Sequence, residues 1–219
     1  MTKYPTFRLA GVALIFSLAG CAVEPASQAI LDAYKVIRAD GSAANGGGLN
    51  PAYRYLRVQI GERVLFMAQG YLDPSPAGPV EVFYSADHNV LRILDGRLVG
   101  VTMKSGIDWL NVTFSGLPAW NALGDEARFE RVRDEGPGYR YGIVEKMRIR
   151  RIAAPNDSKL VAVAAPALTW YEETVQGGRQ PARYAVSDAS HRVVYAEQCL
   201  SDEFCLSWQD WPYSSKDAH

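Results

Sequence analysis

The chain has 219 residues, of which 48% are hydrophobic and 21% are charged, and its formal net charge at pH 7 is −1. This length suits one sizeable domain or two small ones with ample core. The 23 basic residues are balanced by 24 acidic ones, so the composition argues against nucleic acid as a partner.

The first 20 residues have the layout of a secretory signal peptide. Lys3 and Arg8 form a cationic start, and a mostly apolar run over residues 9–18 follows them. That run is shorter than the ~20 apolar residues that a permanent transmembrane helix needs. We predict that residues 1–20 are removed. Because this segment carries two basic residues and no acidic one, the mature chain would hold 21 basic and 24 acidic residues, a formal charge of −3.

The tetrapeptide Leu18-Ala19-Gly20-Cys21 ends this leader. A cysteine directly after Leu-Ala-Gly is typical of a bacterial lipobox, which predicts a diacylglycerol group and an N-acyl chain on Cys21 and no other cofactor. Acyl chains contribute about 0.8 kcal/mol per buried methylene and would hold the protein on a membrane. Ala22 follows rather than Asp, and by resemblance to Gram-negative lipoproteins this predicts the outer membrane, on its periplasmic face. The alternative is an ordinary signal peptide with an incidental cysteine, or a lone membrane anchor.

Residues 21–50 are predicted to form a lipidated tether that contains one amphipathic helix. Apolar residues share one helical face within residues 25–40, and polar residues occupy the remaining positions. The Gly-rich stretch over residues 41–50 predicts a loop. The apolar face consists of Ile30, Leu31, Tyr34 and Ile37.

From residue 53 onward the hydrophobic period changes from helical to two, which predicts a series of short strands. Asp95-Gly96 is the strongest hairpin signal, because both residues tolerate positive φ in a two-residue turn. Residues 140–152 predict a long strand rich in Arg, and residues 159–165 predict a further one. Residues 107–123 are mixed, with a short helix expected near residues 108–110.

Closely spaced strands with turn signals between them indicate an all-β fold, either an antiparallel β-barrel or a barrel-like sandwich. We predict that residues 51–219 form a single β-rich domain of this kind, preceded by the anchor and its helix.

With Cys21 assigned to lipid, Cys199 and Cys205 remain, in a compartment that permits disulfides. We predict a disulfide that closes a short loop and stabilises the fold by ~2–3 kcal/mol on the chain-entropy model. A metal site is the alternative, but it needs more Cys or His nearby, and His191 alone is within reach in the sequence. We therefore predict no metal.

Motifs for catalysis are missing from the sequence, since it contains no G-x-S-x-G elbow, P-loop, H-E-x-x-H or dinucleotide fingerprint. We predict that the protein is not an enzyme. His88 and His191 lie just inside expected turns, which favours a structural role. Acidic pairs could perform glycosidase chemistry only if two carboxyls faced each other across a sugar site. These pairs are Asp73/Glu81, Asp87/Asp95, Asp125/Glu126 and Glu172/Glu173.

Aromatic residues near the C-terminus are a candidate contact surface. Trp208, Trp211 and Tyr213 follow the cysteine pair in a tail that we expect to be exposed. Aromatic faces stack on sugar rings, so these three residues are possible ligand or partner contacts, while the alternative is that they belong to the core.

The segments Asn50–Leu56, Ser85–Leu91 and Gly96–Val99, placed after a lipobox, resemble the YjbF/GfcB family of outer-membrane lipoproteins, which are encoded with exopolysaccharide or group 4 capsule secretion genes. The resemblance covers roughly residues 53–198. It implies a mostly β fold and a non-enzymatic accessory role in polysaccharide secretion or assembly. The implied partners are an outer-membrane β-barrel protein and a periplasmic polysaccharide-export protein, and the polysaccharide itself is a possible ligand. The cysteine pair and the aromatic tail depart from the family pattern.

Three functions follow, in this order of preference. The first is an outer-membrane lipoprotein that assists exopolysaccharide or capsule secretion. The second is a periplasmic carrier of lipid or lipoprotein, in which the sheet and the helix of residues 25–40 enclose an apolar cavity, and an interior filled by side chains would argue against it. The third is a glycan-processing enzyme.

Overall fold

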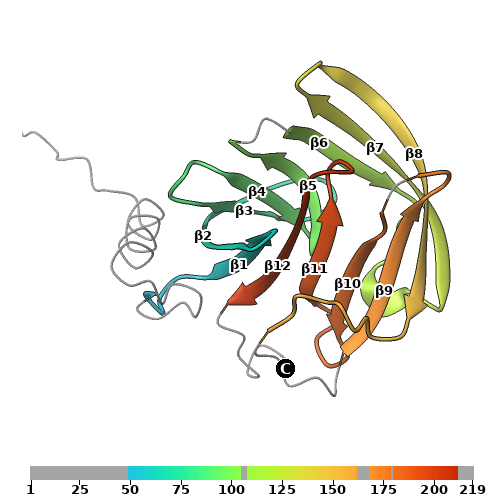
Figure 1. The fold of residues 1–219 in the computed structure, drawn as a ribbon. Helices are drawn as coiled ribbons and strands as arrows, with labels where there is room; N and C mark the ends of the chain where they lie inside the picture. The colour runs from blue at the N-terminus through green and yellow to red at the C-terminus, as the bar shows by residue number, and fades with distance from the viewer. Residues whose placement is uncertain (1–48, 105–107, 162–167, 179, 212–219) are drawn as a thin grey trace, which may run out of the picture.

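The computed structural model describes residues 49–104, 108–161, 168–178 and 180–211. These residues form an all-β fold of twelve strands with one short 3₁₀ turn, η2 (Trp120–Ala122) (Figure 1). Within them, no helix is long and apolar enough to cross a membrane. The strands are β1 (Tyr55–Ile60), β2 (Arg63–Asp73), β3 (Val80–Tyr84), β4 (Val90–Leu94), β5 (Arg97–Thr102), β6 (Asp108–Ser115), β7 (Glu126–Gly136), β8 (Arg140–Ile152), β9 (Leu168–Val175), β10 (Ala182–Ser187), β11 (Val193–Cys199) and β12 (Cys205–Trp211).

The strands form one closed antiparallel barrel. Each strand pairs with the next along the chain, and β1 pairs with β12 from Tyr55↔Trp211 to Ile60↔Leu206. This closure confirms the predicted fold class and selects the barrel over the sandwich. The leader, the anchor and the helix expected over residues 25–40 lie outside the described residues.

The β4–β5 hairpin turns as its sequence predicts. Asp95 and Gly96 have φ values of 48° and 78°, the left-handed region that a two-residue hairpin turn requires. A Cβ on residue 96 would lie 2.2 Å from the Cβ of Val193 at the start of β11. Glycine is therefore required at position 96 for two reasons. It tolerates the positive φ of the turn, and it has no Cβ to collide with β11.

The residues expected to form a short helix near residue 108 lie in β6 instead. Trp109 pairs with Glu135 and Val112 pairs with Arg133 across the β6–β7 ladder, and both apolar side chains are buried in the barrel. Burial against the neighbouring strand overrides the weak local preference for helix. The strand expected over residues 159–165 is also absent from its described part, since residues 159–161 have no strand conformation.

That connecting segment is held on the outside of the barrel. The side chain of Gln209 accepts a hydrogen bond from the Val161 N–H (3.0 Å) and donates one to the Val161 carbonyl (2.9 Å). The Lys159 N–H donates to the hydroxyl of Tyr195 (2.9 Å). Gln209 is buried although it points away from the barrel axis, because this segment covers it.

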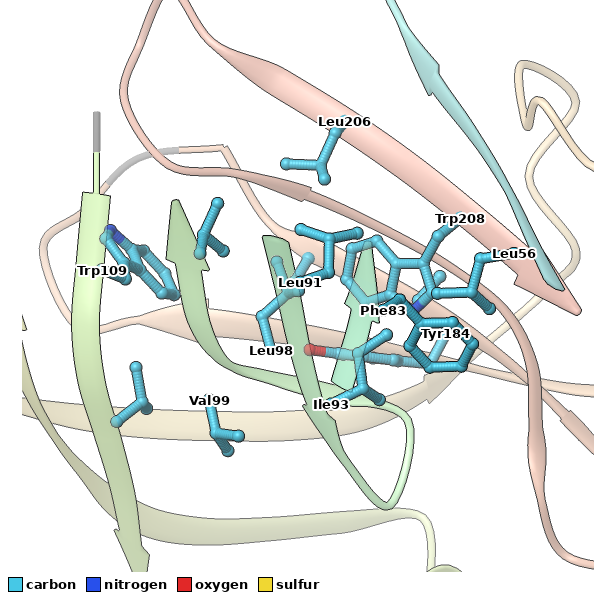
Figure 2. Close-up of a cluster of buried hydrophobic side chains, with 14 of the residues drawn as sticks. Leu56, Phe83, Leu91, Ile93, Leu98, Val99, Trp109, Tyr184, Leu206 and Trp208 are labelled. Carbon is cyan, nitrogen blue, oxygen red and sulfur yellow. The ribbon is translucent and has the colours of Figure 1, made fainter. Parts of the chain in front are cut away.

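Packed side chains fill the barrel interior. Leu56 and Trp208 meet Phe83, Leu91 and Ile93 from the opposite wall, and each of the five is at most 3% exposed (Figure 2). This packing occupies the space in which a lipid carrier would need an apolar cavity, so the described interior argues against that alternative.

The interior also holds a charged pair. The Arg97 Nε–H donates to Oε1 of Glu173 at 2.7 Å, and both side chains are at most 2% exposed. The guanidinium stands 3.7 Å from the ring centroid of Trp120, and the hydroxyl of Tyr184 donates to Oε2 of Glu173 (3.2 Å). The pair joins β5 to β9 across the barrel.

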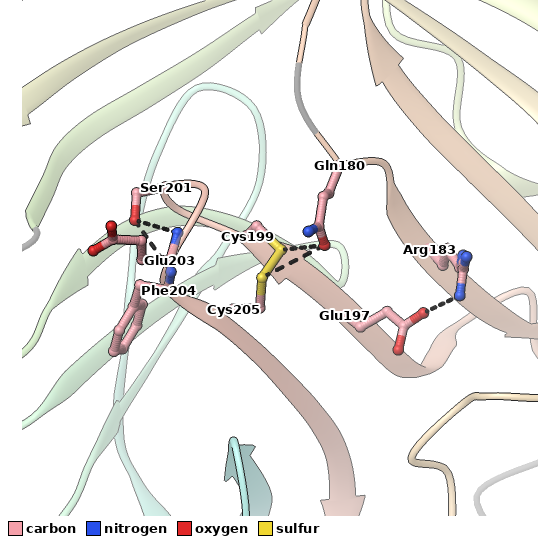
Figure 3. The surroundings of a disulfide bond; sticks show 8 residues. All are labelled: Gln180, Arg183, Glu197, Cys199, Ser201, Glu203, Phe204 and Cys205. Carbon is pink, nitrogen blue, oxygen red and sulfur yellow. Dashed lines mark hydrogen bonds and ion pairs between the residues drawn. A yellow bond between two sulfur atoms is a disulfide. The ribbon is translucent and has the colours of Figure 1, made fainter.

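Cys199 and Cys205 form the predicted disulfide between β11 and β12 (Figure 3). Their sulfur atoms lie 3.4 and 3.8 Å from Oε1 of Gln180. The bond fixes one end of the barrel, at the turn that joins the last two strands.

Candidate functional site

One end of the barrel holds a pocket of about 510 Å³, which we call the mouth pocket. The β2–β3, β4–β5 and β10–β11 connections meet there, and the chain enters β1 at the same end. Leu56, Ile93 and Trp208 give the pocket an apolar floor. Its rim is charged and comes from five separate segments: Arg54, Glu81, Asp95, Arg192 and Asp210.

Arg54 joins two carboxylates of the rim. Its guanidinium bonds to Glu81 on β3 and to Oδ1 of Asp210 on β12, the latter at 3.2 Å. A nitrogen of Arg192 lies 4.0 Å from Glu81. Burial alone would lower the pKa of Arg54, but Asp210 and Glu81 outweigh burial and raise it. The rim therefore offers fixed charges of both signs, which suits a ligand that both donates and accepts hydrogen bonds.

The ionised side chain of Asp210 destabilises the folded protein. Burial raises the pKa of Asp210, and the positive charges of Arg54 and Arg192 offset only part of that effect. A carboxyl whose pKa is higher in the folded state than in the unfolded state binds its proton more tightly after folding. Its ionised form at neutral pH therefore lowers the free energy of unfolding, which is typical of residues kept for function rather than stability.

We expect Asp210→Asn to raise the stability of the protein at pH 7, since it replaces the ionised carboxylate with a neutral side chain of the same shape. The gain should shrink as the pH falls and the wild-type carboxyl takes up its proton. Urea unfolding at pH 7 and pH 5 measures both effects. Asp157→Asn is the matched control, because Asp157 is 75% exposed and should change stability little at either pH. Equal effects of the two variants would contradict this account.

The predicted aromatic contacts lie in different surroundings. Trp208 is 3% exposed, because the alternation of side chains along β12 points it into the barrel. It pairs with Val58 on β1 and with Ala196 on β11. The expectation of an exposed tail is therefore wrong for Trp208, which instead forms part of the floor of the mouth pocket. Trp211 is half-buried, and its ring centroid lies 5.8 Å from that of Phe66. Tyr213 and Cys21 lie outside the described residues.

The predicted acidic pairs do not face each other as pairs. Glu81 and Asp95, taken from two different pairs, line the mouth pocket together with Asp210, which no pair included. Asp87 and Glu173 bond to arginines elsewhere. Leu206, Trp208 and Asp210 are spaced two residues apart, so they share one face of β12. This signal could have identified Asp210 if residues 205–211 had been recognised as a strand.

The histidines occupy turns. His88 and His191 have φ values of 63° and 54° and lie in the connections after β3 and β10. Among the residues that the structure describes, no group of three His, Cys, Asp or Glu side chains could hold a metal ion. The terminal histidine lies outside those residues.

Comparison with solved structures finds a similar fold in the hypothetical lipoprotein YmcC from Escherichia coli (K12). The two share 16% sequence identity with a TM-score of 0.62, over 89% of this chain and 99% of that chain. No family model matches the sequence, and no curated protein matches it. At this identity the likeness shows a common fold.

Proposed function

We propose that the protein is a lipoprotein anchored in the outer membrane through Cys21, on the periplasmic face, and that it is a non-enzymatic accessory factor in exopolysaccharide or capsule secretion. The observation that carries the proposal is that the barrel is like that of a hypothetical lipoprotein over nearly the whole of both chains, while a lipobox precedes it in the sequence. The resemblance to the YjbF/GfcB family supplies the role in secretion.

The shape and charges of the mouth pocket support a function in ligand or partner binding. The mouth pocket combines an apolar floor with fixed guanidinium and carboxylate groups, and it opens at the end of the barrel where the tether joins β1. Such a rim can bind sugar hydroxyls or the polar groups of a protein surface. The proposed partners are an outer-membrane β-barrel protein, a periplasmic export protein and the polysaccharide itself.

Two measurements test the anchor and the role separately. Cys21→Ser should abolish labelling with radioactive palmitate and move the protein from the membrane fraction to the soluble fraction. Cys199→Ser, which leaves the lipobox intact, is the control and should keep both labelling and location. Deletion of the gene should lower the amount of surface polysaccharide, and expression of the wild-type chain should restore it. Unchanged surface polysaccharide after deletion would reject the role in secretion, even if the anchor were confirmed.

A glycan-processing enzyme is the second candidate, favoured by the three carboxyls at the mouth pocket. Glycoside hydrolysis needs one carboxyl to protonate the leaving group and a second to act as base or nucleophile. Turnover of the isolated polysaccharide that is lost in both Glu81→Gln and Asp95→Asn would support this candidate. No turnover by the wild-type protein would leave binding as the function of the pocket.

A further inference from the structure

The joint between β5 and β6 has the fewest paired residues in the barrel wall. The two strands are neighbours there (Figure 1), but among the described residues they share one ladder pair, Val101↔Trp109. Every other pair of neighbouring strands shares at least four. We call the stretch where β5 and β6 continue without pairing, residues 97–100 and 111–115, the seam.

Two β-bulges explain why pairing stops at the seam. In β5, Val99 is an extra residue, because its two neighbours pair with consecutive residues of β4. In β6, Leu110 is an extra residue, because its two neighbours pair with consecutive residues of β7. A bulge bends its strand and disrupts the ladder beside it. Each strand therefore changes course within two residues of the single pair that joins them.

A pocket of about 550 Å³ lies along the seam. Its lining includes residues 111–114, which are consecutive in β6. Because consecutive side chains of a strand point to opposite faces, a pocket that reaches all four lies against the edge of β6. Arg97 and Val99 line the pocket from β5. The pocket adjoins the mouth pocket, with which it shares Leu94 and Asp95.

Backbone groups along the seam have no ladder partners on the seam side among the described residues. Alternate residues of an antiparallel strand direct their N–H and C=O groups to opposite sides, so about half of these groups point into the seam. The positions are buried, since Leu98 is 1% and Val112 is 4% exposed. A buried backbone group without a partner destabilises a fold, so these groups are sites at which another strand can pair.

The side chains around the seam favour an apolar occupant over a charged one. Both arginines of the pocket already have carboxylate partners, Arg92 in Asp73 and Arg97 in Glu173. They therefore do not require an anion. Apolar members of the lining come from both sides of the seam and include Val80, Leu94, Val99, Phe114, Leu117 and Pro118.

We propose that the seam binds an extended, uncharged segment of a partner protein, which pairs as an added strand along the edges of β5 and β6. Its backbone N–H and C=O groups supply the missing ladder partners, and its apolar side chains, at alternate positions, enter the pocket. Residues 97–100 span about 13 Å at roughly 3.3 Å per residue, so the added strand is short. This assignment does not rest on the proposed role in secretion.

Fluorescence polarisation tests the assignment with a labelled, acetylated hexapeptide of alternating Thr and Val, titrated with the purified full chain. The control is the same peptide with an N-methyl group on every residue, which keeps the side chains and removes the backbone donors. The parent peptide should bind at least tenfold more tightly than the control, because several hydrogen bonds depend on those donors. No binding of the parent peptide, or equal binding of the two, would overturn the assignment.

A matched pair of variants tests whether the peptide binds at the seam. Leu117→Asp puts a charge into the lining at a half-buried position and should weaken binding of the parent peptide at least tenfold. Leu110→Asp makes the same change at a residue that is 40% exposed and lies beside Gly136, outside the pocket, and it should leave binding unchanged. Equal weakening by the two variants would contradict binding at the seam.

Hydrogen exchange locates the bound peptide independently of any variant. The parent peptide should slow exchange of the amides of residues 97–100 and 111–115, while the amides of β10 and β11 exchange as before. Slowed exchange elsewhere but not at the seam would overturn the assignment. Slowed exchange at the seam in the protein alone, together with dimer formation at high concentration, would identify a second copy of this chain as the occupant and reject a partner protein.

Discussion

Replacing Arg97 with Met is expected to lower the free energy of unfolding by about 3–5 kcal/mol, the range for removing one partner of a buried ion pair. Arg97 is 1% exposed, and its bond to Glu173 lies inside the barrel wall. Without the guanidinium, the Glu173 carboxylate stays buried, and among the described residues it keeps the hydrogen bond from the hydroxyl of Tyr184. The variant also loses the stacking of the guanidinium over Trp120 at 3.7 Å.

Urea unfolding of single and double variants separates these contributions. If the uncompensated charge dominates, Arg97→Met combined with Glu173→Leu should recover most of the lost stability, since removing both partners of a buried pair is often neutral. A double variant that is as unstable as Arg97→Met alone would assign the loss to Trp120 stacking instead.

The alternation of the strands could be predicted from the sequence because it is a local pattern. Residues 140–152 were expected as a long strand and form β8 with those bounds. The Asp95-Gly96 turn was equally local, since two residues that tolerate positive φ specify it. Each of these features is decided by neighbours in the chain.

The strand that closes the barrel was missed because closure is not local. Residues 205–211 follow a disulfide loop and end in Trp211, so their aromatic residues indicated an exposed tail. Only pairing with β1, some 150 residues earlier in the chain, turns them into β12 and puts Trp208 inside. The rim of the mouth pocket depends on this pairing, because Arg54 and Asp210 meet across it.

Buried charge was equally hard to predict. Arg97 follows a hairpin turn, where an exposed cation would be ordinary, and Glu173 adjoins a second acid in a strand. Their partnership is set by the size of the barrel, which brings β5 and β9 to opposite sides of one interior. Burial in that interior then makes the pair costly to break, although each residue alone looks like a surface charge.

Replacing Glu145 with Gln is expected to lower the free energy of unfolding by about 3 kcal/mol at neutral pH. The carboxylate lies between Arg131 and Arg133, at 2.7 and 3.0 Å, and a neutral amide leaves two guanidinium groups facing each other over Trp109. Lys146→Gln is the matched control, since it changes a neighbouring exposed charge and should have little effect. Urea unfolding at several pH values measures both.

The pH dependence of stability tests the role of the Glu145 carboxylate. Burial alone would raise the pKa of Glu145, but hydrogen bonds and charge from Arg133 and Arg131 outweigh burial and hold that pKa below its ordinary value. A lowered pKa contributes stability that is present above the unfolded-state value of about 4.3 and is lost as the pH falls through the folded-state value. The free energy of unfolding of the wild type should therefore fall in acid towards that of Glu145→Gln. A constant gap between Glu145→Gln and the wild type down to pH 3 would contradict the shared role of the carboxylate.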